Sequence, residues 1–506
     1  MEKTKDITDD LQEIDLASDT QVSVGISEDE LKTLIDDWTE DDPTIVIEEH
    51  QSKSLDGWLP QVPSHACTIF RVPSYIRERD SRSYEPTIAA IGLFHYQKGQ
   101  KLSPSLHIHK SYCVSYLITR HLFLVDKLVA GLGTKEEMLE KCLELMLRLE
   151  PHARSCYSED DKSLDRQMFA EMLLRDGCFI LQLLLKQIKE ERYEEKEEKK
   201  KNVLLELKNW EKKITQAPML GTLWVWNLVV YDLLKLENQI PFFVVQSLFE
   251  LLKTPADKNV DLVQLALKFF NRAHPGKDKK FSSVSSSQEF HHLLHIFHSH
   301  LIPSKYQNMA SNSEEDLEAA PDWIPSATLL QDAGIKFRPK KAAETLLDVT
   351  FKGGVIEIPS LHVDDSTAAV FRNLIVFEQC YPATRTHITV YAAFMDCIIN
   401  AKMDVRALNL NGILFNRLGA ETDAADLFNK LCDQIHYASD RNYLRNVFMD
   451  VTRYYESRWH QWRAALVRNY FSNPWAIISL IAAVILLLLT IEQAVFAGLS
   501  YFRLPK

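Results

Sequence analysis

The residues best suited to chemistry in this sequence are five histidines within ten positions: His291, His292, His295, His298 and His300. On a helix, His291, His295 and His298 would share one face at the spacing i, i+4 and i+7, where imidazoles could bind zinc. No Asp or Cys close in sequence completes a usual ligand set. We therefore predict a partly exposed helix whose histidines are incidental and hold no metal.

Two smaller groups invite the same question. His107 and His109 repeat the histidine pattern more weakly, and we predict no metal there either. Asp364 and Asp365 form a carboxylate pair, but they directly precede Ser366 and Thr367. Such residues cap helices, so capping explains them better than acid–base catalysis.

Sequence signatures of common active sites are missing. The chain has no phosphate-binding glycine-rich loop, dinucleotide-binding fingerprint, nucleophile elbow or zinc-protease helix motif. We therefore predict no catalytic residues, no cofactor and no enzymatic activity. The alternative is an enzyme with an unrecognised site, dependent on a metal held by the histidine cluster.

Acidity is concentrated at the start of the chain. Residues 1–50 hold 17 Asp and Glu against three Lys, a net charge of −14, whereas the whole chain carries −12. The remainder is therefore close to +2, which gives no sign of the basic surface typical of nucleic-acid binding. Eight scattered cysteines without a CxxC pair favour reduced, buried thiols over a zinc site, and pairing stays open.

We predict that residues 1–64 form a largely disordered acidic tail with one short helix near 27–39. Ser27 and Glu30 have capping-box spacing. An apolar stripe follows at i, i+3, i+4 and i+7, formed by Leu31, Leu34, Ile35 and Trp38. This stripe is our candidate partner-binding site, and packing on the protein's own body is the alternative.

Most of the remaining pattern is helical. Apolar residues recur every three or four positions in 105–187, 220–252, 368–379, 389–400, 421–436 and 443–471. Between them, 189–213 resembles a solvated helix face, and 271–288 and 304–321 resemble loops. Short β-rich segments within 335–363 flank Gly353-Gly354, which predicts a hairpin in a small antiparallel sheet. We expect a mainly α-helical domain over 65–470.

The last strongly apolar segment predicts a transmembrane helix over 474–499, followed by a short tail at 500–506. Trp475 to Ile491 is 17 residues without a charge, near the lower limit for crossing a bilayer. We expect Glu492 to reach the membrane interface. No signal-like segment precedes the body, so we expect a single C-terminal anchor in the plasma membrane or an endomembrane, with the body in the cytosol.

Several segments in order resemble motifs of a plant family called domain of unknown function 247, over about residues 66–500. They are Ile69–Pro73, Tyr84–Pro86, Ile91–His95, Asp176–Leu181, Asp232–Phe243, Ile324–Thr328, Phe371–Leu374, Phe377–Cys380, Asp426–Asn429 and Ser472–Trp475. Leu93 and Tyr96 depart from the family pattern, which has Pro and a second His there. The longest segment also has a physical interpretation. Pro241 should stop or kink a helix, and Glu237, Asn238 and Gln239 should make buried hydrogen bonds.

The resemblance implies a plant membrane protein from a family without an established enzymatic activity. Some grass members are proposed as pollen-side determinants of self-incompatibility. We therefore expect a membrane-anchored, non-enzymatic recognition protein that binds an unknown protein partner or ligand and no nucleic acid. The alternatives are the metal-dependent enzyme described above and a purely structural membrane adaptor.

Overall fold

The protein was analysed as a computed structural model. It describes residues 67–97, 104–125, 134–159, 163–188, 223–276, 289–307, 321–381, 383–433, 435, 442–466 and 474–502. This part is mainly helical with small sheets, which confirms the predicted fold class. The acidic tail with its helix near 27–39, and the charged run 189–213, lie outside the described residues, so those predictions stay predictions.

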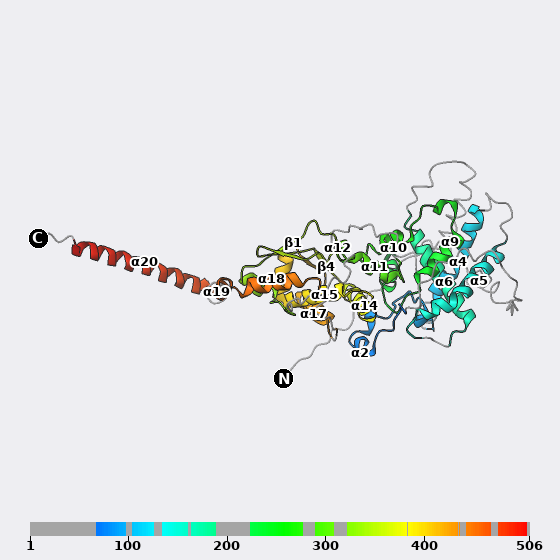
Figure 1. Ribbon diagram of the computed structural model, residues 1–506, viewed down its shortest axis with the longest axis horizontal. Coiled ribbons are helices and arrows are strands. Elements are labelled where there is room, and N and C mark those ends of the chain that lie inside the picture. The colour runs from blue at the N-terminus through cyan, green and yellow to red at the C-terminus, as the bar shows by residue number, and fades with distance from the viewer. Residues whose placement is uncertain are drawn as a thin grey trace, which may run out of the picture. The chain divides into compact units, whose positions relative to one another are not determined.

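Four helices of the N-terminal half pack around helix α6, Arg166–Leu185 (Figure 1). Its neighbours are α4 (Pro104–Val125), α5 (Lys135–Ser155), α9 (Phe242–Leu252) and α10 (Leu262–Phe270). Nearly every residue of α6 from Phe169 onward is buried, as its apolar sequence requires of a helix surrounded by others. A capping box starts α5, in which Thr134 and Glu137 each bond the other's backbone N–H.

The predicted continuous helical stretch 220–252 is interrupted. Helix α8 spans Leu223–Asp232, and the chain then runs without a helix to Pro241, which is the N-cap of α9. The helix therefore ends well before the proline expected to stop it. The physical reason lies outside this segment, because the side chains of residues 232–239 bond to a distant stretch of backbone described below.

Short elements complete this half and lead into the next. They are α2 (Ser74–Arg77), the 3-10 turns Ser81–Ser83, Leu93–His95 and Pro255–Asp257, α11 (Leu293–Leu301), α12 (Ser304–Gln307) and α13 (Ala327–Asp332). The prediction of a loop over 304–321 is wrong at its start, where α12 forms one helical turn.

The predicted hairpin is present, in a sheet that is mixed rather than purely antiparallel. Strands β2 (Thr350–Lys352) and β3 (Val355–Ile358) pair antiparallel through Gly353 and Gly354, whose φ values are 59° and 77°. Strand β1 (Lys336–Pro339) pairs with β3 in parallel. A second parallel pair joins β4 (Leu361–Val363) to β5 (Leu414–Asn416), a strand that the sequence pattern did not predict.

The C-terminal half returns to helices, namely α14 (Thr367–Cys380), α15 (His387–Ile398), α16 (Lys402–Leu410), α17 (Glu421–Leu431), α18 (Arg445–Glu456) and α19 (Arg458–Leu466). The predicted helix over 443–471 is broken at Ser457, whose φ and ψ of −61° and 133° are extended. Helix α16 was not predicted. One continuous cluster of buried apolar side chains runs through both halves, so the described residues between Ile69 and Tyr455 share one hydrophobic core.

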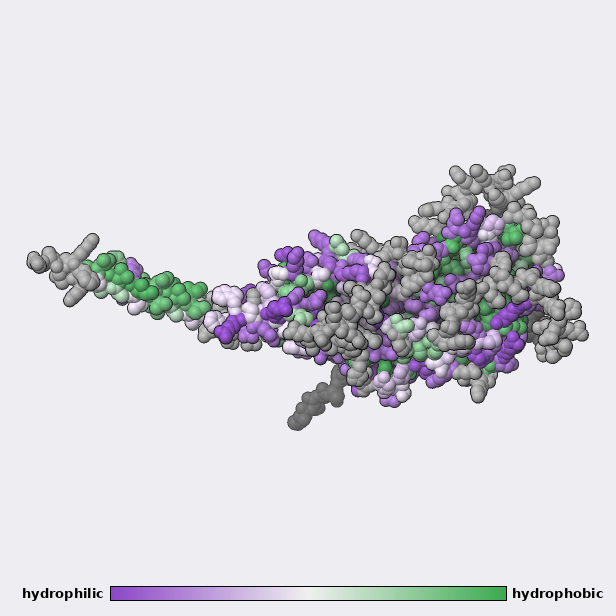
Figure 2. All heavy atoms as spheres, in the orientation of Figure 1, coloured by the Kyte–Doolittle hydropathy of each residue, from purple (hydrophilic) through white to green (hydrophobic). Residues whose placement is uncertain are grey.

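Helix α20 spans Pro474–Phe502. Within it, Ile478–Leu499 is a run of 22 residues that is long and apolar enough to cross a membrane, and no part of it is buried against protein. Apolar side chains cover it in the space-filling view (Figure 2). The prediction of a C-terminal apolar helix that could be a membrane anchor is confirmed.

Candidate functional site

A buried backbone segment explains why polar residues follow α8. Residues 88–95 are all buried, yet only a short 3-10 turn gives them regular structure. Buried N–H groups without a partner are costly, so each needs an acceptor. The Asp232 carboxylate accepts hydrogen bonds of 2.7–2.9 Å from three successive backbone N–H groups, those of Thr87, Ile88 and Ala89. Lys235 pairs with the same carboxylate at 2.9 Å.

Asn238 and Gln239 continue this arrangement. The Asn238 side chain accepts from the backbone N–H of Ile91 at 2.6 Å and donates to the Ala89 carbonyl at 2.7 Å. Gln239 donates to two carbonyls at 2.8 Å, those of Leu233 and Lys235. The predicted buried hydrogen bonds are confirmed. Those of Asn238 hold the irregular backbone segment, and those of Gln239 hold the loop after α8.

Glycine is required where this segment comes closest to its support. Gly92 has a φ of 75°, and a Cβ at this position would collide with the Gln239 carbonyl oxygen. Its N–H donates to Asp176 on α6 at 2.8 Å, and Lys110 on α4 pairs with the other oxygen of that carboxylate at 2.6 Å. Gly92, Asp176 and Gln239 belong to three different family-like motifs, which therefore meet here in a structural role.

Glu237 has the most deeply buried of the three carboxylates that hold this segment, ahead of Asp176 and Asp232. Its side chain has no exposed surface, and its Oε1 accepts from the backbone N–H of Val72 at 2.6 Å and from the Arg77 guanidinium. His95 lies 3.6 Å from its other oxygen. A buried carboxylate is tolerated only when donors surround it in this way. We name the set Asp176, Asp232, Glu237, Asn238 and Gln239 the polar framework.

The histidine cluster differs from the prediction in two respects. Helix α11 begins at Leu293, so His291 lies before the helix and does not share its face. The other four histidines are buried rather than partly exposed. His292 is the N-cap: its Nδ1 accepts from the His295 N–H at 3.2 Å, and its Nε2 bonds the Thr68 carbonyl at 3.0 Å.

The histidines also have different protein partners. His298 Nε2 lies 2.8 Å from Glu378, a carboxylate that also accepts from the N–H groups of Ile388 and Thr389. His291 bonds the Tyr381 hydroxyl at 2.7 Å. Within the described ranges, no three His, Cys, Asp or Glu side chains are placed to share a metal ion. These bonds give the cluster a packing role, and its lack of a metal stays a prediction.

Buried histidines make the stability of the body dependent on pH. Burial, with a smaller contribution from His291, lowers the pKa of His292 to about 3, and burial lowers those of His300 and His387 to about 4. The pKa of histidine in the unfolded chain is about 6.5. Between about pH 4 and 6.5 these histidines therefore bind more protons in the unfolded chain than in the folded protein. The free energy of unfolding should therefore fall as pH falls through that window.

We expect the melting temperature of the protein to fall across this window, and His292→Gln to make its pH dependence shallower. The slope is the measured quantity, because loss of the N-cap also lowers stability at neutral pH. His152→Gln, at a partly exposed position on α5, is the control. An unchanged slope in His292→Gln would show that this histidine does not titrate on unfolding.

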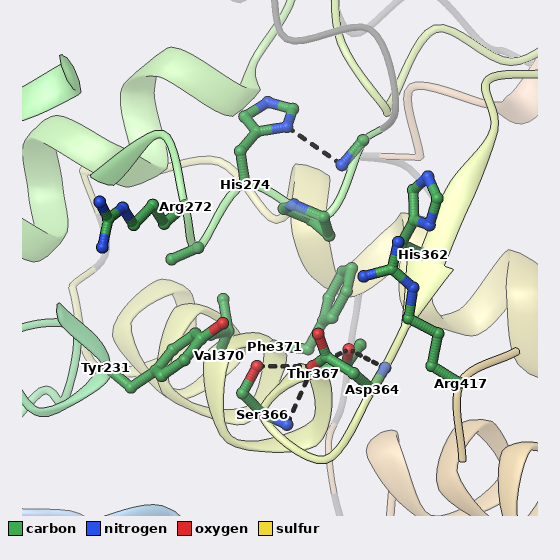
Figure 3. A pocket seen from close by; sticks show the side chains of 13 residues that line it. Tyr231, Arg272, His274, His362, Asp364, Ser366, Thr367, Val370, Phe371 and Arg417 are labelled. Atoms are coloured by element: carbon green, nitrogen blue, oxygen red, sulfur yellow. Dashed lines mark hydrogen bonds between the residues drawn. The ribbon is translucent and has the colours of Figure 1, made fainter. Parts of the chain in front are cut away.

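A cavity of about 140 Å³ lies between segments that are distant in sequence (Figure 3). Tyr231 comes from the end of α8, Arg272 to Gly276 follow α10, His362 to Phe371 run from β4 into α14, and Arg417 follows β5. Figure 3 shows the Arg417 guanidinium beside His362 on one side and Tyr231 on the opposite side. A backbone hydrogen bond of 2.9 Å joins two of these lining segments, from the His362 N–H to the Pro275 carbonyl.

Several polar groups of the cavity bond to one another. Asp364 Oδ1 accepts from the backbone N–H and the hydroxyl of Ser366, at 3.0 and 2.6 Å, and from the Thr367 hydroxyl at 3.2 Å. Helix α14 begins at Thr367 with Ser366 as its N-cap and without a side-chain capping bond, so the predicted capping role is wrong and Asp364 instead orders the turn before the helix. Burial raises the pKa of the Tyr231 hydroxyl, which keeps it a neutral donor. Arg417 adds an exposed guanidinium to the lining, a group that can bond a planar polar ligand through two parallel N–H groups.

The sequence did not indicate this cavity. Arg272 and Arg417 are single exposed arginines in loops, and no local pattern relates them. Only Asp364, Ser366 and Thr367 attracted notice, as a cap. The predicted partner-binding residues Leu31, Leu34, Ile35 and Trp38 lie outside the described residues, so that site stays a prediction.

Comparisons with known proteins give one consistent family. A family model described as "Plant protein of unknown function", domain of unknown function 247, matches residues 69–489. UPF0481 protein At3g47200 of Arabidopsis thaliana is 28% identical over 467 residues, 88% of this chain and 90% of that protein. A second Arabidopsis thaliana UPF0481 protein, At3g02645, is 32% identical over 185 residues, 36% of this chain and 35% of its own. No solved structure matches the chain.

Proposed function

The chain belongs to the plant family called domain of unknown function 247, and from this premise we propose that it is a membrane-anchored, non-enzymatic recognition protein. The observation that carries the proposal is α20, whose 22-residue apolar run is exposed on all sides. Exposed apolar surface of this extent is unfavourable in water and favourable in a bilayer. The anchor would sit in the plasma membrane or an endomembrane, with the body in the cytosol.

The polar framework gives the family-like motifs a structural role rather than a catalytic one. Asp176, Asp232, Glu237 and Asn238 are buried, and their side chains bond backbone groups or buried cations. Groups committed in this way maintain the fold. Recognition would then lie in surfaces built on this scaffold, among which we place the apolar stripe of the acidic tail. Self-incompatibility recognition, implied for some grass members, stays a prediction for this chain.

The tail tests the recognition proposal. Burying Trp38 with the three aliphatic side chains of its stripe would contribute on the order of 5 kcal/mol before ordering costs. We expect Leu34→Ala with Trp38→Ala to weaken capture of a protein partner by the full-length chain by more than about tenfold, since about 1.4 kcal/mol is tenfold. The measurement is co-purification from detergent-solubilised plant membranes, with partners identified by mass spectrometry.

Leu11→Ala with Leu16→Ala is the matched control, since it removes two apolar side chains of the tail outside the stripe. Because acidic residues flank the stripe, we expect capture of the partner to weaken as the salt concentration is raised. Identical partners for all three proteins, in equal amounts, would remove the stripe from the proposal. The enzyme alternative is tested separately by metal analysis of the purified protein, where stoichiometric zinc lost on substitution of His295 and His298 would favour it.

A further inference from the structure

Helix α19 leaves two large aromatic side chains in contact with solvent. Trp459 and Trp462 are 70% and 71% exposed. Residues three apart on a helix are neighbours on one face, so both indoles belong to the same face of α19. Tryptophan is highly buried on average in folded proteins. A pair left exposed on one face therefore indicates a contact surface.

The helix that carries this pair is attached to the body. Arg463 on α19 donates a hydrogen bond of 3.5 Å to the carbonyl of Asp332, the last residue of α13. Gly334 packs so closely on the Arg463 guanidinium that a Cβ there would collide with it. Helix α18 also contacts α19. The face bearing Trp459 and Trp462 is therefore held in a defined orientation relative to α13 and α18.

Chain length places this face near the bilayer. Helix α19 ends at Leu466 and α20 begins at Pro474. Eight steps along the chain reach at most roughly 28 Å even when fully extended. If α20 crosses a membrane, as the proposed function has it, the end of α19 lies within that distance of the start of the anchor.

The composition of α19 fits a lipid surface. Arg458–Leu466 contains two arginines and no acidic residue, and Arg458 is exposed like the two tryptophans. Indole rings favour the headgroup layer of a bilayer, and guanidinium groups bond lipid phosphates. A second copy of the chain fits less well, because a two-fold interface would bring each arginine-bearing face against itself.

We propose that α19 lies on the membrane surface, with Trp459 and Trp462 in the headgroup layer and Arg458 at a lipid phosphate. This inference rests on the proposed anchor and adds a second lipid contact. Two contacts, α19 and α20, restrict the tilt of the body relative to the bilayer plane, whereas a single helix joined by a linker would not. The body would then present a defined face to its partner.

The test uses the full-length protein in phosphatidylcholine vesicles, with and without phosphatidylserine. The lipids carry bromine atoms, which quench tryptophan fluorescence, either near the headgroup or deep in the acyl chain. Four proteins are compared: the wild type, Trp459→Phe with Trp462→Phe, Trp475→Phe, and Trp226→Phe as a control in α8. Circular dichroism confirms that each variant is folded.

We expect the double variant to lose a quenched component that is larger with bromine near the headgroup and with phosphatidylserine present. Trp475→Phe should lose a separate component that reports the anchor, and Trp226→Phe should lose none. If Trp475→Phe lost a quenched component and the double variant lost none, the α19 contact would be overturned and the anchor would stand. If neither Trp475→Phe nor the double variant lost a quenched component, both the anchor and the α19 contact would be overturned. If Trp459 and Trp462 were shielded from water but not quenched by the brominated lipids, a second copy of the chain would be favoured as their cover, and the proposal would be overturned.

Discussion

Deletion of residues 473–506 is expected to move the protein from the membrane fraction to the soluble fraction while the body stays folded. Thirteen of the 22 residues in Ile478–Leu499 are Leu, Ile, Val or Phe. Each of these residues contributes about 0.3–0.6 kcal/mol to the free energy of membrane insertion, which sums to a gain on the order of 6 kcal/mol. An acidic residue at the centre of the helix costs about 2.5–3.5 kcal/mol. Glu492 lies off centre and should offset only part of the gain.

The body should survive this deletion because its apolar core lies upstream of α20. Every residue of the hydrophobic cluster falls between Ile69 and Tyr455, and the apolar run of α20 buries nothing against it. The measurements are carbonate extraction of membranes and the circular dichroism melt of the released protein. Glu492→Gln is the control and should remain in the membrane. A truncated chain that still resists carbonate would show that another segment anchors the protein.

The same membranes report the orientation. With the body in the cytosol, protease added to intact, right-side-out plasma-membrane vesicles should leave the body uncut, and detergent should make it sensitive. Digestion before detergent treatment would reverse the topology and favour a body outside the cell.

Glu237→Ala is expected to lower the free energy of unfolding by about 3–5 kcal/mol, the usual cost of removing one partner of a buried ion pair. The substitution leaves the backbone N–H of Val72 without its acceptor and the Arg77 guanidinium without its buried carboxylate. Because typical domains are stable by only about 5–15 kcal/mol, this is a large fraction of the total. Chemical denaturation, with hydrogen exchange at the Val72 amide, measures both effects.

Glu250→Ala provides the matched control. Glu250 pairs with Lys253 on the protein surface, where the two side chains are 47% and 42% exposed. Exposed pairs contribute about 0–1 kcal/mol, so this variant should be nearly as stable as the wild type. If Glu237→Ala lost no more stability than Glu250→Ala, the polar framework would not be what holds residues 67–97 in place.

Local patterns in the sequence correctly predicted most helices. Side chains three and four positions apart share a helix face, so a stripe such as that of α6 is visible within twenty residues. The Gly353-Gly354 hairpin was predicted for the same reason, since its positive φ values depend on two neighbouring residues. The apolar run of α20 was also visible, because composition alone distinguishes it from the preceding helices. Family membership was indicated by a series of motifs in order.

Tertiary contacts decided the rest. The break after α8 depends on Asp232, whose carboxylate bonds the backbone N–H of Thr87, 145 positions away. The apolar periodicity within 220–252 does not depend on that distant backbone, so we expected the helix to continue as far as Pro241. Strand β5 was missed because its partner β4 is distant in sequence, and three residues carry no pattern of their own.

The candidate sites divide in the same way. Residue type drew attention to His291, His295 and His298. The hydrogen-bond partners of His291 and His298 are Tyr381 and Glu378, which come from α14 and its C-cap and change what these imidazoles do. Arg272 and Arg417 line one cavity only because the segments after α10 and β5 both bond to strand β4, at His362 and Val363. The sequence by itself determined the local elements, the exposed apolar helix and the family. Only the tertiary structure decided which polar groups are committed to the fold and which face a cavity, because burial and hydrogen bonding join residues that no local spacing relates.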